Sequence, residues 1–149
     1  MKLAIASDHA GLTLKTEVVS YLKQKKVDVL DLGVNESISV DYPDFAEKVA
    51  SHVSEKKVDA GILICGTGVG MCITANKFKG VRAAVVSDVF SAKMSREHND
   101  ANVLCFGTRV VNEAKAKEIV DAWLGAKFEG GRHQGRVGKI SELEKKNFR

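Results

Sequence analysis

The stretch ICGTGVG, at residues 64–70, holds the residue types that point most directly to chemistry. Cys65 ends an apolar run, and Gly66, Gly68 and Gly70 then alternate with Thr67 and Val69. Successive backbone N–H groups in such a turn form an anion-binding nest, and a helix that begins there adds the positive end of its dipole. The turn is therefore predicted to hold an anion.

Cys65 stands at the mouth of this turn, where a thiol has two possible roles. A cysteine that ends an apolar run is often a small core residue. Beside a nest at a helix N-terminus, however, the thiolate form is favoured. A thiolate there can remove a carbon-bound proton while the N–H groups hold the resulting enediolate, and one such donor is worth roughly 3 kcal/mol in the transition state. Cys72 and Cys105 are expected to be packing residues.

Nucleotide-binding patterns fit the glycine turn only in part. A P-loop needs a Gly-Lys-Ser/Thr ending, which does not follow here. A dinucleotide fingerprint needs a final glycine that GTGVGM lacks, although Asp88 lies near the spacing of its ribose-binding acid. A tight turn without a ligand is the other alternative, but three glycines in five residues exceed what a simple turn needs.

Two polar pairs end other predicted elements. Asp8-His9 follows the first strand, where Asp8 is either a helix N-cap or a group aimed with His9 at a ligand. His98-Asn99 ends a predicted helix. His98 there is either a C-terminal cap that suits the helix dipole or an acid/base histidine beside a hydrogen-bonding amide. Both interpretations of each pair remain open from sequence alone.

Arg132 and Arg136 lie four residues apart in GGRHQGR, so they share one helix face. Such a pair is usually solvated, but two guanidinium groups on one face also suit a phosphate. The preceding glycine break, at 125–131, is expected to let the chain turn back over the sheet.

Apolar periodicity predicts the elements that must position these residues. Short apolar runs predict strands at 3–6, 27–32, 61–65, 81–86 and 103–106. Helical spacing predicts helices around 14–22, 45–53, 73–78, 91–100 and 116–124, and a last one from about 132 to 146. Alternation of strand and helix indicates an α/β fold with a five-stranded parallel sheet, a Rossmann-like three-layer sandwich. Ligands bind beyond the carboxyl ends of such strands, where SDHAG, CGTGVG, Ser87-Asp88 and FGTR (106–109) all fall.

Composition narrows the classes of function. The chain has 149 residues, the length of one domain, with a net charge of +4. Aromatic residues make up 6% and are not interleaved with basic ones, which disfavours nucleic-acid binding. No apolar run suggests a signal peptide or a membrane span, and three cysteines without a CxxC pair argue against a disulfide framework or a zinc ribbon. These features predict a cytoplasmic protein with reduced thiols.

Several motifs in order resemble the B-type ribose-5-phosphate isomerases and related sugar-phosphate isomerases. The resemblance covers nearly the whole chain, in SDHAG (7–11), VDYPDFA (40–46), GILICGTGVG (61–70), ANKFKGVRA (75–83), SREHNDAN (95–102), GTRVV (107–111), IVDAWL (119–124) and GGRHQGRV (130–137). It implies an aldose–ketose isomerase of pentose phosphate metabolism that needs no metal or organic cofactor. It also implies a homodimer or homotetramer with the site at a subunit interface, where the C-terminal helix can pack on a partner.

The resemblance also implies a role for each matching residue. Cys65 would be the base, Gly66 to Gly70 would hold the enediolate with help from Thr67, and His98 would open the furanose ring. The remaining residues would bind the sugar hydroxyls (Asp8, Asn99, Tyr42), the phosphate (His9, Arg132, Arg136) and the ligand more generally (Arg109).

One branch of this family carries its base as a glutamate just after the glycine turn. Met71 stands there in this chain, so the chain resembles the cysteine-using branch. The predicted substrate pair is ribose 5-phosphate and ribulose 5-phosphate. Two alternatives remain open: an isomerase of a six-carbon sugar phosphate such as allose or galactose 6-phosphate, and a non-catalytic module that binds a nucleotide or sugar phosphate. The second would leave Cys65 and His98 without a role.

Overall fold

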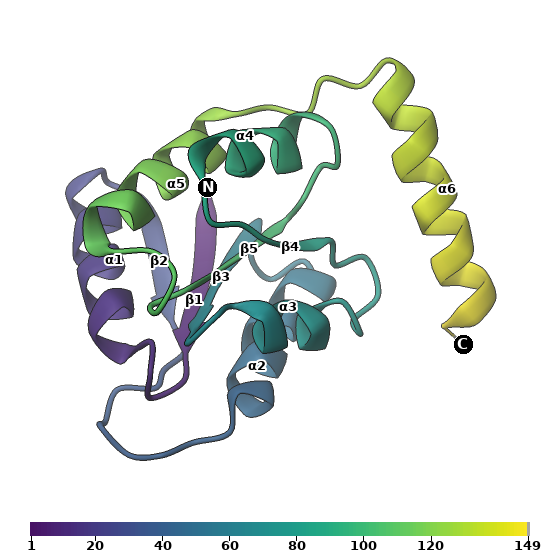
Figure 1. Ribbon diagram of the computed structural model, residues 1–149. Helices are drawn as coiled ribbons and strands as arrows, with labels where there is room; N and C mark the ends of the chain where they lie inside the picture. The colour runs from purple at the N-terminus through teal and green to yellow at the C-terminus, as the bar shows by residue number, and fades with distance from the viewer. Residues whose placement is uncertain (149) are drawn as a thin grey trace.

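The computed structural model describes residues 1–148, which contain a five-stranded sheet with all strands parallel (Figure 1). Its strand order is β2-β1-β3-β5-β4. The strands are β1 (Lys2–Ser7), β2 (Asp28–Asp31), β3 (Ala60–Cys65), β4 (Ala83–Val85) and β5 (Val103–Gly107). The central strand β3 is buried along its whole length, as expected for a parallel strand covered on both faces. The predicted fold class and sheet are confirmed, although β2 and β4 are shorter than predicted.

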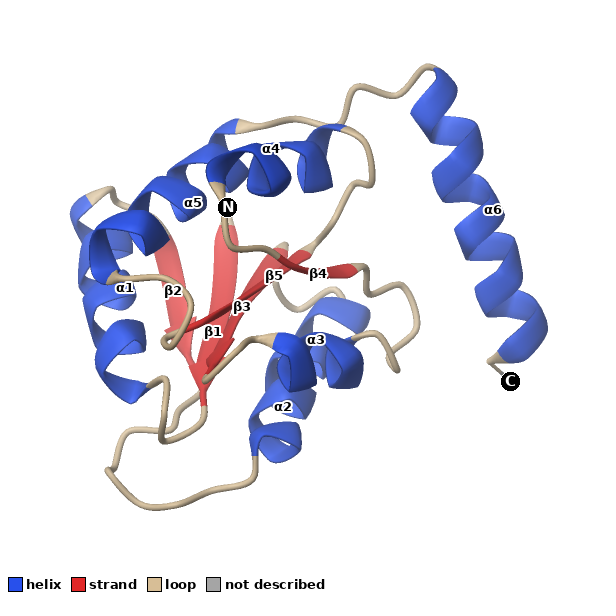
Figure 2. Cartoon of the chain, viewed as in Figure 1, coloured by secondary structure: helices blue, strands red, loops and turns tan. Residues whose placement is uncertain are grey.

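Helices cover both faces of the sheet (Figure 2). The helices are α1 (Leu12–Gln24), α2 (Tyr42–Ser54), α3 (Val69–Ala75), α4 (Val89–Glu97), α5 (Glu113–Gly125) and α6 (Arg132–Asn147). Ile62 and Ile64 of β3 pack in one core cluster with residues of α1, α4 and α5. Leu63 and Cys65 pack in a second cluster with residues of α2 and α3. Alternate residues of β3 therefore face opposite layers, and Cys65 faces the layer that contains α3.

The helix after the glycine turn begins earlier than the sequence indicates. The apolar spacing predicts a helix over 73–78, but α3 runs from Val69 to Ala75. Gly68 is its N-cap and has a left-handed φ of 81°, which glycine adopts without steric cost. The glycine turn therefore leads directly into the first turn of α3.

The helix before β5 is also displaced from its predicted range of 91–100. It begins at Val89 because the side chain of Asp88 caps it, accepting a hydrogen bond of 2.7 Å from the N–H of Ser91. The helix ends at Glu97, and Asp100 has a left-handed φ of 48°, which is incompatible with a right-handed helix. Asp88 therefore serves as a helix cap. Its spacing from the glycine turn no longer supports a dinucleotide-binding site.

The last helix, α6, stands apart from the sheet (Figure 1). The prediction that the glycine break folds this segment back over the sheet is wrong. Because α5 runs antiparallel to the strands, it ends at their amino edge, and α6 starts there and passes beside β4. The Gly80 N–H donates a 2.8 Å hydrogen bond to Glu144 Oε1 of α6. A cavity of about 680 Å³ lies between α6 and the body of the molecule. No helix within residues 1–148 is both long and apolar enough to cross a membrane.

Candidate active site

Cys65 is the last residue of β3 and lies at the carboxyl edge of the sheet. It is 5% exposed, and its Sγ accepts a hydrogen bond of 3.1 Å from the backbone N–H of Gly68. Thr67 adds a second local contact, because its Oγ1 accepts from the N–H of Val69 at 3.3 Å. The Gly68 N–H thus points at the sulfur, and a backbone donor in this position stabilises negative charge on it.

The glycine turn packs backbone to backbone against the end of β5. A Cβ added at Gly107 would lie 2.4 Å from the Cα of Thr67, and one at Gly68 would lie 2.8 Å from the backbone of Phe106. Two hydrogen bonds of 3.0 Å tie the strand ends together, from the Thr108 N–H to the Cys65 carbonyl and from the Arg109 N–H to the Gly66 carbonyl. The turn can therefore hold its shape only while glycine occupies 68 and 107.

Replacing Gly107 with alanine is expected to displace the glycine turn, because the new methyl group has no room beside Thr67. The expected cost is about 1–3 kcal/mol of unfolding free energy, measured by urea denaturation. Gly138→Ala is the matched control. This glycine lies inside α6 with nothing within 4 Å of an added Cβ, so the change is expected to stabilise by about 0.5–1 kcal/mol. Equal stability of the Gly107 variant and the parent would contradict the close packing.

Two side chains flank the glycine turn. The ring of Tyr42, the first residue of α2, lies so near Gly70 that an added Cβ would be 2.5 Å from it. The guanidinium of Arg109 lies over Gly66, about 3.7 Å from an added Cβ. Both side chains are exposed toward solvent, so the turn opens between an aromatic ring and a positive charge. This environment suits a polar, negatively charged ligand.

Asp8 and His9 follow β1 at the same edge. Asp8 is 8% exposed and its Oδ1 accepts a 3.1 Å hydrogen bond from the N–H of Gly11. It is not the N-cap of α1, because that position is Gly11 itself. The Nδ1 of His9 accepts from the Val40 N–H at 3.1 Å, which leaves Nε2 of this exposed ring as a donor. His9 can therefore donate a hydrogen bond to an anion even when it is uncharged.

The second group of predicted residues lies at the opposite edge of the sheet. His98 is the C-cap of α4, and Asn99 follows it in the connection to the amino end of β5. Arg132 and Arg136 are exposed in the first turns of α6. The carbonyl of Glu97 accepts from the Glu129 N–H at 3.0 Å, which ties the start of α6 to the end of α4.

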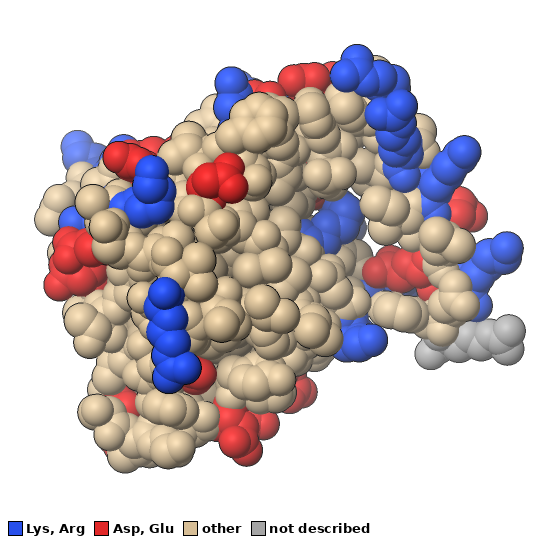
Figure 3. Space-filling model, viewed as in Figure 1, with Lys and Arg blue, Asp and Glu red and all other residues tan. Residues whose placement is uncertain are grey.

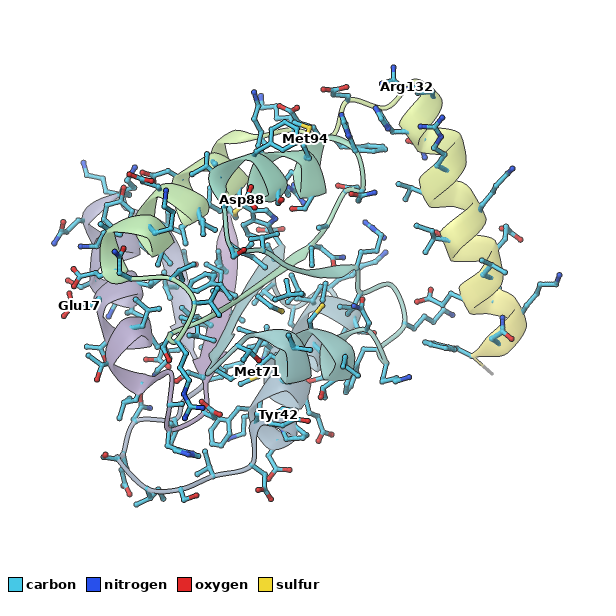
Figure 4. All side chains as sticks on the ribbon, viewed as in Figure 1. Glu17, Tyr42, Met71, Asp88, Met94 and Arg132 are labelled. Atoms are coloured by element: carbon cyan, nitrogen blue, oxygen red, sulfur yellow. The ribbon has the colours of Figure 1, made fainter. Side chains whose placement is uncertain are left out.

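One chain therefore does not bring all the predicted site residues together. Tyr42 and Arg132 lie at opposite ends of the molecule (Figure 4). The six residues of β3 separate the two edges by roughly 16 Å. Cys65, the glycine turn, Asp8, His9, Tyr42 and Arg109 form what we call the thiol half-site, and His98, Asn99, Arg132 and Arg136 form the histidine half-site. The topological prediction that SDHAG, CGTGVG, Ser87-Asp88 and FGTR lie at the carboxyl edge is confirmed, and the histidine half-site lies at the other edge.

His133 is a residue of the histidine half-site to which the sequence assigned no role. It is 5% exposed, and its ring stacks on that of His98 with centroids 4.1 Å apart and planes 11° from parallel. His133 and Val137 are the buried residues of α6. Their spacing of four positions, which places both on one helix face, is the feature of the sequence that indicates this burial. The predicted phosphate-binding residues Arg132 and Arg136 lie on the exposed face of the same helix.

Glu129 completes a cluster in which ligand atoms of His98, Glu129 and His133 lie within 4.8 Å of one another. Residues of these types can bind a metal ion. The lone pairs of imidazole lie in the ring plane, however, and those of two nearly parallel rings cannot converge on one ion. The observed geometry therefore favours ring stacking over chelation.

Cys72 has the thiol with a clearly lowered pKa. It is half-buried in α3, and a hydrogen bond with the Cys105 thiol lowers the pKa of Cys72 to about 7, whereas burial raises that of Cys105. We expect iodoacetamide to alkylate Cys72 at a half-maximal rate near pH 7, because its thiolate already forms there. Mass spectrometry of the Cys65→Ala protein checks this without interference from Cys65. A midpoint near pH 9 would contradict the prediction.

Comparisons with known proteins identify the family of this chain. A family model described as ribose/galactose isomerase matches residues 3–140. Ribose-5-phosphate isomerase B of Escherichia coli (strain K12) is 54% identical over 145 residues, covering 97% of this chain and 97% of that protein. The structure of ribose-5-phosphate isomerase B from Clostridium thermocellum is 55% identical, with a TM-score of 0.96, and covers 98% of this chain and 99% of that one. That of the Mycoplasma genitalium enzyme with bound ribulose 5-phosphate is 51% identical, with a TM-score of 0.95, covering 98% and 97%.

Proposed function

Because this chain belongs to the ribose/galactose isomerase family, we propose that it is an aldose–ketose isomerase that interconverts ribose 5-phosphate and ribulose 5-phosphate. The observation that carries the proposal is the Cys65 thiol at the mouth of the glycine turn, with its Sγ 3.1 Å from the Gly68 N–H. A buried thiol beside a backbone donor of a glycine turn suits a reaction in which a proton leaves carbon and negative charge develops on oxygen.

Cys65 is the base in this proposal. Its thiolate removes the proton from C2 of the open-chain aldose, and the electron pair of that bond forms the enediolate while the C1 carbonyl oxygen becomes negative. The N–H groups of 66–70, with Thr67, hold this oxygen. The proton of the C2 hydroxyl passes to the C1 oxygen, the thiol returns its own proton to C1, and C2 becomes the ketone carbonyl, so the ketose forms with no net gain or loss of atoms. Asp8 and Tyr42 bind sugar hydroxyls beside this turn.

His98 opens the furanose ring before this step. It takes the proton of the anomeric hydroxyl, the C1–O4 bond breaks, and the ring oxygen gains a proton, so the open aldehyde forms without a change in composition. Asn99 binds a sugar hydroxyl beside it. His9, Arg132 and Arg136 hold the phosphate, where paired guanidinium groups match its oxygens, and Arg109 is a further ligand contact.

The thiol and histidine half-sites must then come from two copies of the chain. The two half-sites lie at opposite edges of one sheet, and no single molecule of substrate spans roughly 16 Å. Exposed apolar side chains on both α6 and the body support a second copy as the partner. They are Ile73, Val85, Val89, Phe90, Ile140 and Leu143, which are between 37% and 72% exposed.

The position of α6 also supports a homodimer or a homotetramer built from dimers. Figure 3 shows a hollow between this helix and the rest of the molecule, where the cavity beside β4 lies. A helix that packs so little on its own chain is suited to pack on another. In a two-fold dimer the thiol half-site of each copy meets the histidine half-site of the other copy, so two equivalent active sites form. A phosphorylated sugar substrate and three free cysteines support a cytoplasmic location.

Proton NMR of the purified protein with ribose 5-phosphate in D₂O tests the proposed function. We expect ribulose 5-phosphate to appear, with deuterium bound to carbon at the positions that Cys65 protonates. Allose 6-phosphate and galactose 6-phosphate serve as the comparison, because a six-carbon isomerase would convert one of them faster. Binding of all three sugar phosphates without any conversion would contradict the proposal and indicate a binding module.

A further inference from the structure

The imidazole of His98 rests against a second imidazole of the same chain. The rings of His98 and His133 are 4.1 Å apart between centroids and 11° from parallel. Stacking at this distance restricts rotation of the His98 ring about its side-chain bonds, because a rotated ring would collide with its neighbour. Among residues 1–148, His133 is thus placed to determine where the His98 nitrogens point.

His133 is itself held firmly. It is 5% exposed, and its backbone N–H donates a 3.0 Å hydrogen bond to the Gly130 carbonyl. In the same segment, the backbone N–H of Glu129 donates a 3.0 Å hydrogen bond to the Glu97 carbonyl. The backbone that carries His133 is therefore joined to the residue that precedes His98. The segments that carry the two rings are thus tied to each other within one chain.

The surroundings of the His133 ring determine its charge. Its Nε2 is buried without a hydrogen-bond partner, and the nearest charge, Glu129 Oε2, is 3.7 Å away. Burial together with the charges of His98, Arg132 and Arg136 lowers the pKa of His133, and the attraction of Glu129 does not overcome them. His133 is therefore uncharged at neutral pH, and the flat face of its ring makes the contact.

We propose that His133 is a positioning residue for His98, and that its ring face holds the His98 imidazole in the orientation that opens the furanose. This inference rests on the proposed ring-opening role of His98. It assigns the positioning to the flat face of the ring and not to its nitrogen atoms. Phenylalanine at position 133 should therefore preserve ring opening, whereas alanine should not.

Ring opening can be measured apart from isomerisation in the Cys65→Ala background. A protein that opens and closes the furanose without proton transfer at carbon exchanges the α and β anomers of ribose 5-phosphate, and NMR exchange spectroscopy measures that rate. His133→Ala is expected to slow the catalysed exchange about tenfold, since misplaced catalytic groups lose rate steeply. His133→Phe is expected to stay within about threefold of its parent. Gln134→Ala, an exposed neighbour on α6, is the matched control.

Two further measurements separate positioning from loss of structure. Thermal unfolding of His133→Phe should match or exceed that of the parent, because a buried unpartnered nitrogen is removed. With Cys65 intact, both His133 variants should exchange the C1 hydrogen of ribulose 5-phosphate for deuterium at the parent rate, since that step does not need an opened ring.

The outcomes distinguish this inference from the proposed function. Unchanged anomer exchange in His133→Ala would overturn the positioning role. So would a phenylalanine variant as slow as the alanine variant, because the nitrogen atoms would then be required. If the Cys65→Ala parent did not accelerate anomer exchange at all, the ring-opening role of His98 would fail first, and the inference about His133 would fail with it.

Discussion

Cys65→Ala is expected to lower turnover of ribose 5-phosphate by about 10³-fold or more while ligand affinity changes less than about threefold. A positioned base contributes about 10²–10⁴-fold, and Cys65 is that base in the proposed mechanism. The backbone donors and the phosphate contacts remain in the variant, so binding should persist. Steady-state kinetics and calorimetric titration with ribulose 5-phosphate measure the two quantities.

Cys72→Ala is the matched control for that variant. Cys72 lies seven residues after Cys65 and packs against the core cluster that contains Cys65. The pKa of its thiol is lowered to about 7. A lowered pKa favours reactivity with alkylating reagents, but position relative to the nest decides which thiol can act on the substrate. The control should keep near-parent turnover. Catalytic loss in Cys72→Ala with retention in Cys65→Ala would reverse the assignment.

His98→Asn is expected to lower conversion of ribose 5-phosphate by about a hundredfold, because the furanose must open before Cys65 can reach C2. Ribulose 5-phosphate cannot form that ring, since its C5 oxygen carries the phosphate. Exchange of its C1 hydrogen with D₂O depends on Cys65 and should stay within about threefold of the parent. Proton NMR follows both reactions in the same sample.

The control for this variant is His52→Asn. His52 lies on α2, where its Nδ1 contacts the Lys48 carbonyl at 2.7 Å, far from both half-sites. It should leave both reactions unchanged. If His98→Asn slowed the C1 exchange of the ketose as much as it slowed aldose conversion, then His98 would act in proton transfer at carbon and not in ring opening.

The strands and most helices could be predicted because each carries its own periodic apolar pattern. Strand β3 is apolar at nearly every position and is buried throughout. The start of α3 could not be predicted in this way. Glycines at 66, 68 and 70 indicate a loop by composition, and only the left-handed backbone of Gly68 shows that a helix begins at Val69.

The division of the candidate residues between two edges of the sheet could not be predicted in full from the sequence. Topology places residues after strands at one edge, which correctly groups Asp8, Cys65 and Arg109. His98 ends a helix that returns to the other edge, so the same rule separates it from them. The spacing of His133 and Val137 indicates a buried face of α6, but no local pattern reveals the contact between His133 and His98.

Mixing two inactive variants tests most directly the central claim that two copies build each active site. Cys65→Ala and His98→Asn chains with different tags are co-expressed, and the heterodimer that carries both tags is isolated. One of its two sites then contains both changes and the other contains neither, so the account predicts about half of the parent activity. A heterodimer no more active than the two inactive parents would contradict it, because Cys65 and His98 would then have to act within one chain.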